Sequence, residues 1–377
     1  MNDRTDLVMN HHKNRKRNKK SKCSRRRVIL VLLATFILIA VIAIIVAVLL
    51  IKLNQTTSKN RISEAILRWN TTGITIAGIS NELGNDSTHL NTPWDVTLDY
   101  QNSLYIADRN NHRIQKYLAG SLNGTTVAGQ ENGTSGSTLS YLQNPSRILI
   151  DVNGNMYITD TGNHRILSWS SGSSSGVMIA GTGVGGSSNN QLRTPYGIAR
   201  DINSDKLYIA DYSNSRIMLY LSGASSGTVI AGGNGPGTNA TQLKNPVGLY
   251  FDSLSNSLVI ANHAACNILR WVIGETSWTL LAGSINGTVG NTSTLMNLPV
   301  DITFDPMGNM YVADRNNHRI QLFMVGQSDG ITIAGVTGIS GDNATLLNRP
   351  WSIKLDSQLN LYVADSNNHR IQKFLRY

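Results

Sequence analysis

One phrase of five residues recurs six times and constrains the fold of this chain more than any other feature. It reads Leu-Tyr-Ile-Ala-Asp at residues 104–108 and returns with conservative changes at residues 156–160, 207–211, 258–262, 310–314 and 361–365. Successive copies begin 52, 51, 51, 52 and 51 residues apart. A fixed period of this length indicates a repeat architecture, in which every copy is one supersecondary unit that packs against its neighbours. The 377 residues therefore need not divide into several unrelated domains.

Each unit carries the sequence signals of four short strands. A proline opens an alternating run that ends in Asp, the five-residue phrase follows, and a short apolar and aromatic run leads to a stretch that closes in Ala-Gly. Gly, Asn and Ser turns separate these runs, and no helical periodicity interrupts them. Four strands in about 50 residues are typical of a propeller blade. We predict an all-β fold, a six-bladed β-propeller over residues 73–377.

The two ends of the repeat region predict how the ring closes. The last unit, residues 350–377, stops after its third strand, whereas an unattached fourth strand, residues 73–78, precedes the first unit. Six sets of inner strands and six outer strands are then available. We expect residues 73–78 to complete the blade of residues 350–377, because a closed ring leaves no sheet edge exposed to other chains.

A polar motif follows the phrase and connects the second strand to the third. Asp-Arg-Asn-Asn-His-Arg-Ile occupies residues 108–114 and 314–320, with close copies at 160–166 and 365–371 and a variant at 211–217. With the proline and Ala-Gly landmarks, this motif closely resembles the NHL repeat, and the resemblance covers residues 73–377. It implies a six-bladed propeller. Because the motif recurs in nearly every blade, we interpret its residues as scaffold rather than as one binding site.

The fourth blade predicts which motif residues pair. There the motif is Asn-His-Ala-Ala-Cys-Asn-Ile, so amides at Asn262 and Asn267 replace both the Asp and the Arg of the other blades. Losing one partner of a buried ion pair costs about 3–5 kcal/mol, whereas replacing both is often nearly neutral. The joint change indicates that the Asp and the Arg pair. The four motif histidines lie one per blade and are not expected to share a metal, and Cys266 is expected to be a small buried residue.

The first 72 residues predict a membrane anchor. Residues 1–27 form a basic tail, residues 28–51 an uncharged apolar run, and residues 52–72 a stalk. Twenty-four residues of helix span about 36 Å, enough for a bilayer core of about 30 Å. Positive charge precedes the run, so the tail is expected in the cytosol and the propeller outside it or in a lumen, a type II signal-anchor topology. Cys23, near the inner leaflet, is a candidate for lipidation.

The placement of N-glycosylation sequons agrees with this topology. Nine occur in the chain and none lies in residues 1–51, which predicts a glycoprotein whose propeller is exposed to the secretory pathway. The candidate asparagines are Asn54, Asn70, Asn85, Asn123, Asn132, Asn239, Asn286, Asn291 and Asn343.

The long loops that join one blade to the next predict where a ligand binds. They run 14–16 residues from glycine to proline, vary between blades, and emerge on the same face as the motif turns. Binding residues are often found on variable loops of a rigid scaffold, and aromatic and Arg residues are enriched at binding hot spots. The candidates on this face are Trp94, Arg109, Arg147, Tyr196, Tyr212, Arg315 and Trp351. The alternative is that Trp94, Tyr196 and Trp351 only form a lid over the ring.

Two function classes remain after the charge is divided along the chain. Of the net +10, residues 1–27 carry +9, which leaves +1 for the other 350 residues and argues against nucleic-acid binding. The first hypothesis is a non-enzymatic module without a cofactor that binds an extracellular protein, peptide or glycan. The second, implied by resemblance to lyases and calcium-dependent lactonases with this fold, is an enzyme with metal in the central channel. For a metal the sequence offers Asp95 and Asp301, with His89 and His263 as the other histidines outside the repeated position.

Overall fold

The computed structural model of the protein describes residues 41–42, 45–49 and 67–377. Residues 41–42 and 45–49 are helical. Within the described ranges, no helix combines the length and the apolar character that a membrane crossing requires. The rest of the predicted anchor over residues 28–51, together with Cys23 and Asn54, lies outside the described residues.

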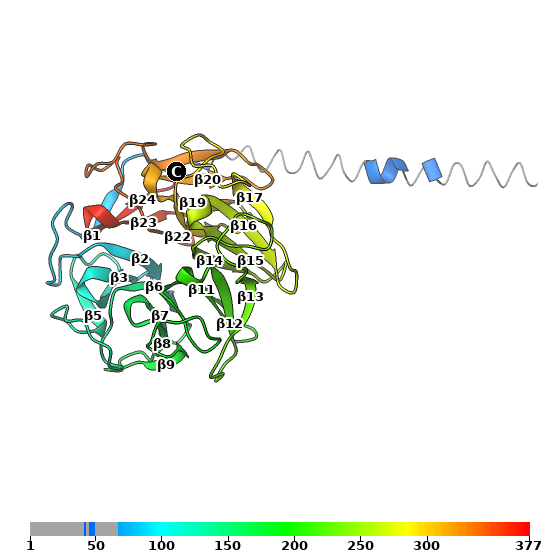
Figure 1. Ribbon diagram of the computed structural model, residues 1–377. Helices are drawn as coiled ribbons and strands as arrows, with labels where there is room; N and C mark the ends of the chain where they lie inside the picture. Colours follow the sequence, from blue (N-terminus) through cyan, green and yellow to red (C-terminus); the bar gives the residue numbers. More distant parts are fainter. Residues whose placement is uncertain (1–40, 43–44, 50–66) are drawn as a thin grey trace, which may run out of the picture. The chain divides into compact units, whose positions relative to one another are not determined.

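Residues 74–374 form six four-stranded antiparallel sheets, which Figure 1 shows arranged around a central axis. The innermost strands are β2 (Pro93–Leu98), β6 (Pro145–Ile150), β10 (Pro195–Asp201), β14 (Pro246–Asp252), β18 (Pro299–Phe304) and β22 (Ser352–Leu355). The second strands are β3 (Leu104–Asp108), β7 (Met156–Asp160), β11 (Lys206–Asp211), β15 (Ser257–Asn262), β19 (Met310–Asp314) and β23 (Leu361–Asp365).

The two outer positions of each sheet complete the blades. The third strands are β4 (Arg113–Tyr117), β8 (Arg165–Trp169), β12 (Arg216–Tyr220), β16 (Asn267–Val272), β20 (Arg319–Phe323) and β24 (Arg370–Phe374). The outermost strands are β5 (Gly124–Gly129), β9 (Val177–Gly181), β13 (Thr228–Gly232), β17 (Thr279–Gly283), β21 (Gly330–Gly335) and β1 (Ile74–Gly78). The predicted six-bladed, all-β propeller is confirmed.

The ring is closed by a strand from the other end of the sequence. β1 pairs antiparallel with β24 and is the outermost strand of the sheet that contains β22, β23 and β24. Residues 68–72, which the sequence assigns to a stalk, also pack on the propeller. Trp69 bridges to Arg376, and its indole N–H donates to the Leu359 carbonyl at 2.7 Å. The propeller therefore begins about five residues earlier than the sequence suggests, and its N-terminal and C-terminal segments contact each other.

The hydrophobic core lies between neighbouring blades. One cluster joins Ile114 of the first blade to Ile148 and Ile158 of the second, and similar clusters fill the spaces between the second and third, third and fourth, fourth and fifth, and sixth and first blades. These residues come from the repeated phrase and from the runs that flank it. Equivalent residues of each repeat therefore form the core between successive blades. Blade-to-blade burial of this kind stabilises the ring by removing apolar surface from water.

A short 3₁₀ turn follows the second strand of every blade. The turns are η1 (Arg109–Asn111), η2 (Thr161–Asn163), η3 (Tyr212–Asn214), η4 (His263–Ala265), η5 (Arg315–Asn317) and η6 (Ser366–Asn368). Each ends in a left-handed residue, such as His112 with φ 53°. The carbonyl of that residue lies against the closing glycine of the outermost strand, where a Cβ on Gly129 would collide with it. The Ala-Gly landmark therefore reflects close approach of two backbones.

Candidate functional site

The motif residues form an outer ring of buried ion pairs. In five blades the Arg Nε donates to the motif Asp at 2.7–2.9 Å, as Arg113 does to Asp108. The same guanidinium donates to carbonyls of the long loop, including Asn85 and Asp86. In the fourth blade the side-chain amide of Asn262 donates to Asn267 at 3.1 Å. The predicted Asp–Arg pairing and its amide replacement are both confirmed.

The left-handed turn residue links each blade to the next. His112 accepts the backbone N–H of Asn144 at its Nδ1 (3.1 Å), and His164, His318 and His369 accept the corresponding N–H of the following blade. In the other two blades Ser215 Oγ and Cys266 Sγ take this position and accept the equivalent backbone N–H. These six contacts run once around the ring, so the motif histidines have a structural role and do not converge.

A β-bulge at the start of the innermost strands positions the candidate ligand-binding residues. The register between β2 and β3 shifts between Pro93 and Asp95, and the same shift follows the proline of β6, β10, β14 and β18. A bulge leaves one residue out of the ladder and redirects its side chain. Trp94 is that residue in the first blade. The sequence did not predict the bulge, but it lies directly after the proline landmark.

Three of the predicted aromatic residues meet at the inner mouth of the ring. The rings of Trp94 and Trp351 stack with centroids 3.7 Å apart and planes 10° apart. Tyr196 packs against both indoles at 5.5 and 6.1 Å, and Tyr212 lies edge-on to Tyr196 at 4.7 Å. Trp351 is only 8% exposed. The predicted lid is therefore present, although Trp94, Tyr196 and Tyr212 keep part of their surface accessible.

Two predicted arginines cover the outer faces of the stacked indoles. Cζ of Arg109 lies 3.9 Å from the ring centroid of Trp94, and Cζ of Arg315 lies 4.9 Å from that of Trp351. Each indole uses its other face for the stack, so the four side chains form a column in the order Arg109, Trp94, Trp351, Arg315. We call this the arginine–tryptophan column. Burial lowers the pKa of Arg109, and burial together with the charge of Arg349 lowers that of Arg315 to about 10.

Arg147, the remaining candidate, lies below the column in the central channel. Its Nη1 is 2.7 Å from Asp301 Oδ1 and 3.3 Å from Asp95 Oδ1. Ser352 Oγ lies within hydrogen-bonding distance of both carboxylates. Burial raises the pKa of Asp95. Burial acts in the same direction on Asp301, but the charge and hydrogen bond of Arg147, together with the charge of Lys354 and the backbone N–H of Ile353, outweigh it and hold the pKa of that carboxyl below its usual value.

The two carboxylates that the sequence offers for a metal are thus engaged by protein donors. Besides the Arg147 contacts, Asp95 accepts the backbone N–H of Ile148 at 2.7 Å and Asp301 that of Ile353 at 3.0 Å. Over residues 67–377, no three His, Cys, Asp or Glu side chains gather as they would around a metal ion. The donor set at this point of the channel is that of a buried ion-pair network rather than of a calcium or zinc site.

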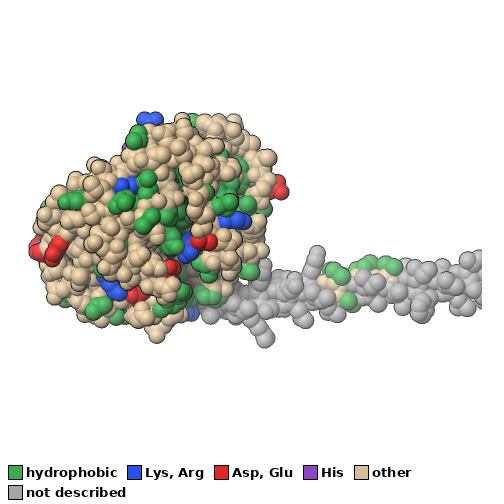
Figure 2. All heavy atoms as spheres, turned by 90° about the horizontal axis from the view of Figure 1, so that it is seen from below, with side chains coloured by type: hydrophobic (Ala, Val, Ile, Leu, Met, Phe, Trp, Pro, Cys, Tyr) green, Lys and Arg blue, Asp and Glu red, His purple; other side chains and the backbone are tan. Residues whose placement is uncertain are grey.

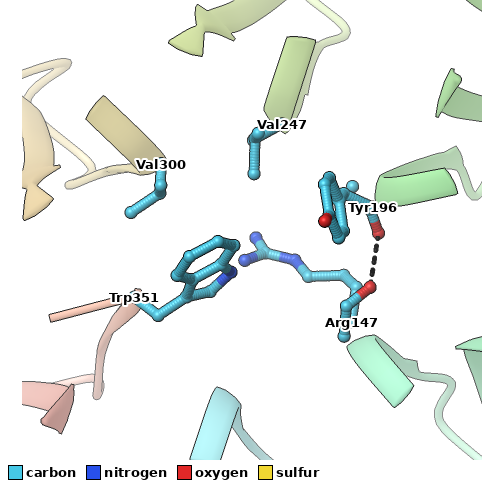
Figure 3. A pocket seen from close by; sticks show the side chains of 8 residues that line it. Arg147, Tyr196, Val247, Val300 and Trp351 are labelled. Carbon is cyan, nitrogen blue, oxygen red and sulfur yellow. Dashed lines mark hydrogen bonds between the residues drawn. The ribbon is translucent and has the colours of Figure 1, made fainter. Parts of the chain in front are cut away.

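A small cavity lies next to Arg147. It is lined by Tyr196, Val247, Val300, Trp351 and two glycines, and Figure 3 shows the guanidinium between Trp351 and Tyr196 with the valines opposite. Ser146 Oγ donates to the Tyr196 carbonyl at its edge. The space accommodates roughly one water molecule. This cavity is too small for an organic ligand, so the candidate ligand site is the mouth above it.

Two further residues at the mouth were not among the predicted ligand-binding residues. His263 is buried, with its ring centroid 6.2 Å from that of Tyr212 and 6.5 Å from that of Trp351, and burial lowers its pKa to about 4. It occupies the turn position that Arg109, Tyr212 and Arg315 occupy in other blades, a sequence signal that could have revealed it. Arg349 is exposed and close enough to Arg315 to influence its charge.

On the face drawn in Figure 2, acidic and basic side chains are interspersed. The eight sequon asparagines among residues 67–377 are all exposed, and six of them lie in the long loops. The loop of the third blade, residues 182–194, is the long loop without a sequon.

Comparison with known proteins defines the class. The profile of the NHL repeat matches residues 90–117, 296–323 and 347–374, which lie in the first, fifth and sixth blades. The protein is a six-bladed β-propeller with NHL repeats. NHL repeat-containing protein 3 of Mus musculus is 30% identical over 92 residues, which span 24% of this chain and 26% of that relative.

Solved structures share the fold at low sequence identity. A Bacteroides thetaiotaomicron protein of unknown function superposes with a TM-score of 0.63 at 16% identity, covering 81% of this chain and 76% of the other. An auxiliary nutrient binding protein of Bacteroides ovatus gives 0.60 at 14%, covering 82% and 77%. A gluconolactonase of Xanthomonas campestris gives 0.55 at 11%, covering 81% and 98%. At these identities the likeness concerns the fold alone.

Proposed function

We propose that this chain is a non-enzymatic binding module, displayed outside the cytosol by a single-pass anchor over residues 28–51, that captures an extracellular ligand at the mouth of its loop face. The observation that carries the proposal is the arginine–tryptophan column. Aromatic and Arg side chains that come from different blades converge there, while the repeated motif around them is occupied with structural contacts. Such residues are typical of binding hot spots.

The location outside the cytosol rests on the sequence. The basic tail precedes the apolar run, and every sequon follows it. Glycans on the long loops would leave the third blade as the open approach to the mouth, because residues 182–194 contain no sequon. One fold relative is a nutrient binding protein, which is compatible with a binding role on this scaffold.

The test is capture of a partner by the full-length glycosylated chain in detergent. We expect a saturable partner from extracellular extract that is lost in Trp94→Ala and Trp351→Ala but retained in Tyr100→Ala. Tyr100 is 78% exposed and lies in the turn between β2 and β3, away from the mouth, which makes it a matched aromatic control. Thermal midpoints of all three variants establish that the propeller remains folded. Equal capture by all variants would overturn the proposal.

The alternative is a metal-dependent lyase or lactonase with its site in the channel. One protein that shares the fold is a gluconolactonase, which is compatible with this alternative. Elemental analysis of the same preparation for calcium and zinc separates the two. A stoichiometric metal that disappears in Asp95→Asn with Asp301→Asn, without any captured partner, would favour the enzyme. No metal, with a partner that depends on Trp94, would favour the binding module.

A further inference from the structure

The side chain at the first position of the motif turn makes different contacts in odd-numbered and even-numbered blades. In the even-numbered blades it bonds to the next blade: Thr161 Oγ1 donates to the Pro195 carbonyl at 2.8 Å, Ser366 Oγ to that of Pro93, and His263 Nδ1 lies 3.2 Å from that of Pro299. The odd-numbered blades place Arg109, Tyr212 and Arg315 at this position, and these side chains make no such bond. They turn to the aromatic rings of the mouth instead.

The two arginines of this set have no acidic partner among residues 67–377. Arg109 and Arg315 each donate from Nη1 to the neighbouring asparagine, at 2.7 and 3.0 Å. The Nε of each is buried without any hydrogen-bond partner. By contrast, Arg147 and the motif arginines all contact carboxylates. A partly desolvated guanidinium without a counter-charge is costly to the folded state, and an anionic ligand would supply the charge that is missing.

The occupied aromatic faces restrict the kind of ligand. Sugars and nucleic-acid bases are commonly held by stacking on an exposed aromatic face, but each indole of the column is covered by the other indole on one side and by a guanidinium on the other. The column therefore presents N–H groups rather than ring faces. Its binding chemistry is hydrogen bonding and charge, which suits carboxylates, since a guanidinium matches the geometry of a carboxylate.

The positions of the cations indicate an extended ligand. Arg109 and Arg315 lie at opposite ends of the column, separated by both indoles, so one small anion does not contact both. Arg349 adds a cation at the Arg315 end. The two channel carboxylates, Asp95 and Asp301, are already paired with Arg147. A chain with acidic groups along its length matches this arrangement.

From these contacts we infer that the mouth recognises an extended acidic peptide segment, with one carboxylate at Arg109 and another at Arg315 and Arg349. This inference rests on the proposed function and names the ligand of that site. Tyr212, which lies edge-on to Tyr196, borders the mouth on the side of the third blade.

The probe is a fluorescein-labelled deca-glutamate peptide, with deca-glutamine as its uncharged match, titrated into the full-length chain and followed by fluorescence anisotropy. We expect saturable binding of deca-glutamate only, weakened at least ten-fold in Arg109→Gln with Arg315→Gln. Lys116→Gln with Lys206→Gln removes the same charge far from the motif turns, and should weaken binding less than two-fold. Arg109→Lys with Arg315→Lys keeps the charge without the fork and is expected to fall between these limits.

Equal affinities in the two Gln double variants would overturn the inference, since binding would then reflect total charge. Heparin oligosaccharide or oligo-dT binding that depends on Arg109 and Arg315, with no binding of deca-glutamate, would overturn the acidic peptide while leaving the mouth as a binding site. A captured partner lost in Trp94→Ala but unaffected by the arginine variants would likewise overturn only this inference. Thermal midpoints near that of the unmodified chain confirm that the variants are folded.

Discussion

The outer ring of motif residues and the inner mouth of the propeller use the same residue types in opposite ways. In the ring, five blades repeat an arginine that is buried against an aspartate. The fourth blade has a pair of asparagines at the same two positions. At the mouth, Arg109 and Arg315 occupy positions that vary between blades and contact no carboxylate of residues 67–377. Repetition with a paired counter-charge identifies scaffold, whereas arginines at variable positions without a counter-charge favour the mouth as the candidate ligand site.

Breaking an ion pair of the ring should have the largest effect on stability. Arg113→Asn leaves Asp108 buried without its counter-charge, and we expect the free energy of unfolding to fall by about 3–5 kcal/mol. Asp108→Asn with Arg113→Asn reproduces the amide pair of the fourth blade and should cost less than the single change. Chemical denaturation of the three proteins measures this. Equal losses in the single and double variants would contradict the ion-pair account.

The innermost strands below the mouth should be the next most sensitive. A Cβ added at Gly248 would lie 2.6 Å from the Val300 carbonyl oxygen, and one at Gly197 would collide with that of Val247. Both contacts are to backbone of the neighbouring blade, which cannot rotate away. We expect Gly248→Ala to cost about 1–3 kcal/mol through overpacking. A thermal midpoint unchanged by this variant would show that the blades can move apart at the channel.

The histidine contacts of the ring predict a loss of stability in acid. Burial lowers the pKa of His112, His318 and His369, and nearby arginines lower it further for the first two. Each histidine accepts a backbone N–H at Nδ1, so the fold requires the neutral form. The stability they contribute is complete above their usual pKa of about 6.5. This contribution is lost as the pH falls from about 6.5 to the lower pKa that each histidine has in the folded state. The free energy of unfolding then decreases by at most about 1.4 kcal/mol per histidine and pH unit.

Replacing one histidine tests this dependence. His112→Ser copies Ser215, which makes the same contact with a group that does not titrate. The free energy of unfolding, measured between pH 5 and 8, should then change less steeply than in the unmodified chain. An identical slope would mean that His112 does not bind its proton on unfolding.

Changes at the mouth should have the smallest effect on stability. Arg109→Gln and Arg315→Gln each remove a cation–π contact of about 0.5–1 kcal/mol, offset by the release of a partly desolvated charge. We expect the free energy of unfolding to change by less than about 1 kcal/mol. Denaturation curves check this, and losses as large as that of Arg113→Asn would place these arginines in the scaffold and remove the contrast between ring and mouth.

The sequence predicted most of the ring but only part of the mouth. The period of the phrase and the order of turn signals encode local strand pairing, so the six blades, the third-strand end at residue 374 and the outer strand of residues 74–78 could be counted directly. Trp94, Tyr196, Tyr212, Arg109, Arg315 and Trp351 were selected because they vary between blades, and the structure gathers them. His263 was missed as a ligand-binding candidate although it shares the turn position of Arg109, Tyr212 and Arg315, and Arg349 was missed because nothing in its local sequence distinguishes it.

Asp95 and Asp301 illustrate what sequence could not decide. In the alignment of blades they are two carboxylates at the position that Arg147, Ser352 and two glycines take elsewhere, which allows either a metal or an ion pair. Only the closed ring brings Arg147 to 2.7 Å from Asp301 and Ser352 between the two acids. For the first 67 residues the sequence is the sole basis, because their membrane topology is predicted from charge and hydropathy patterns alone.

The sequence by itself thus determined the number of blades, the order of strands and the paired motif residues, because each depends on contacts between residues close in the chain or repeated with a fixed period. The tertiary structure decided which side chains meet at the axis. Trp94 and Trp351 belong to the first and last blades, and their stack with Arg109 and Arg315 depends on ring closure and, on the Trp94 side, on the bulge after Pro93. Contacts at the centre of the ring join side chains from blades that are far apart in the sequence, and no local pattern specifies them.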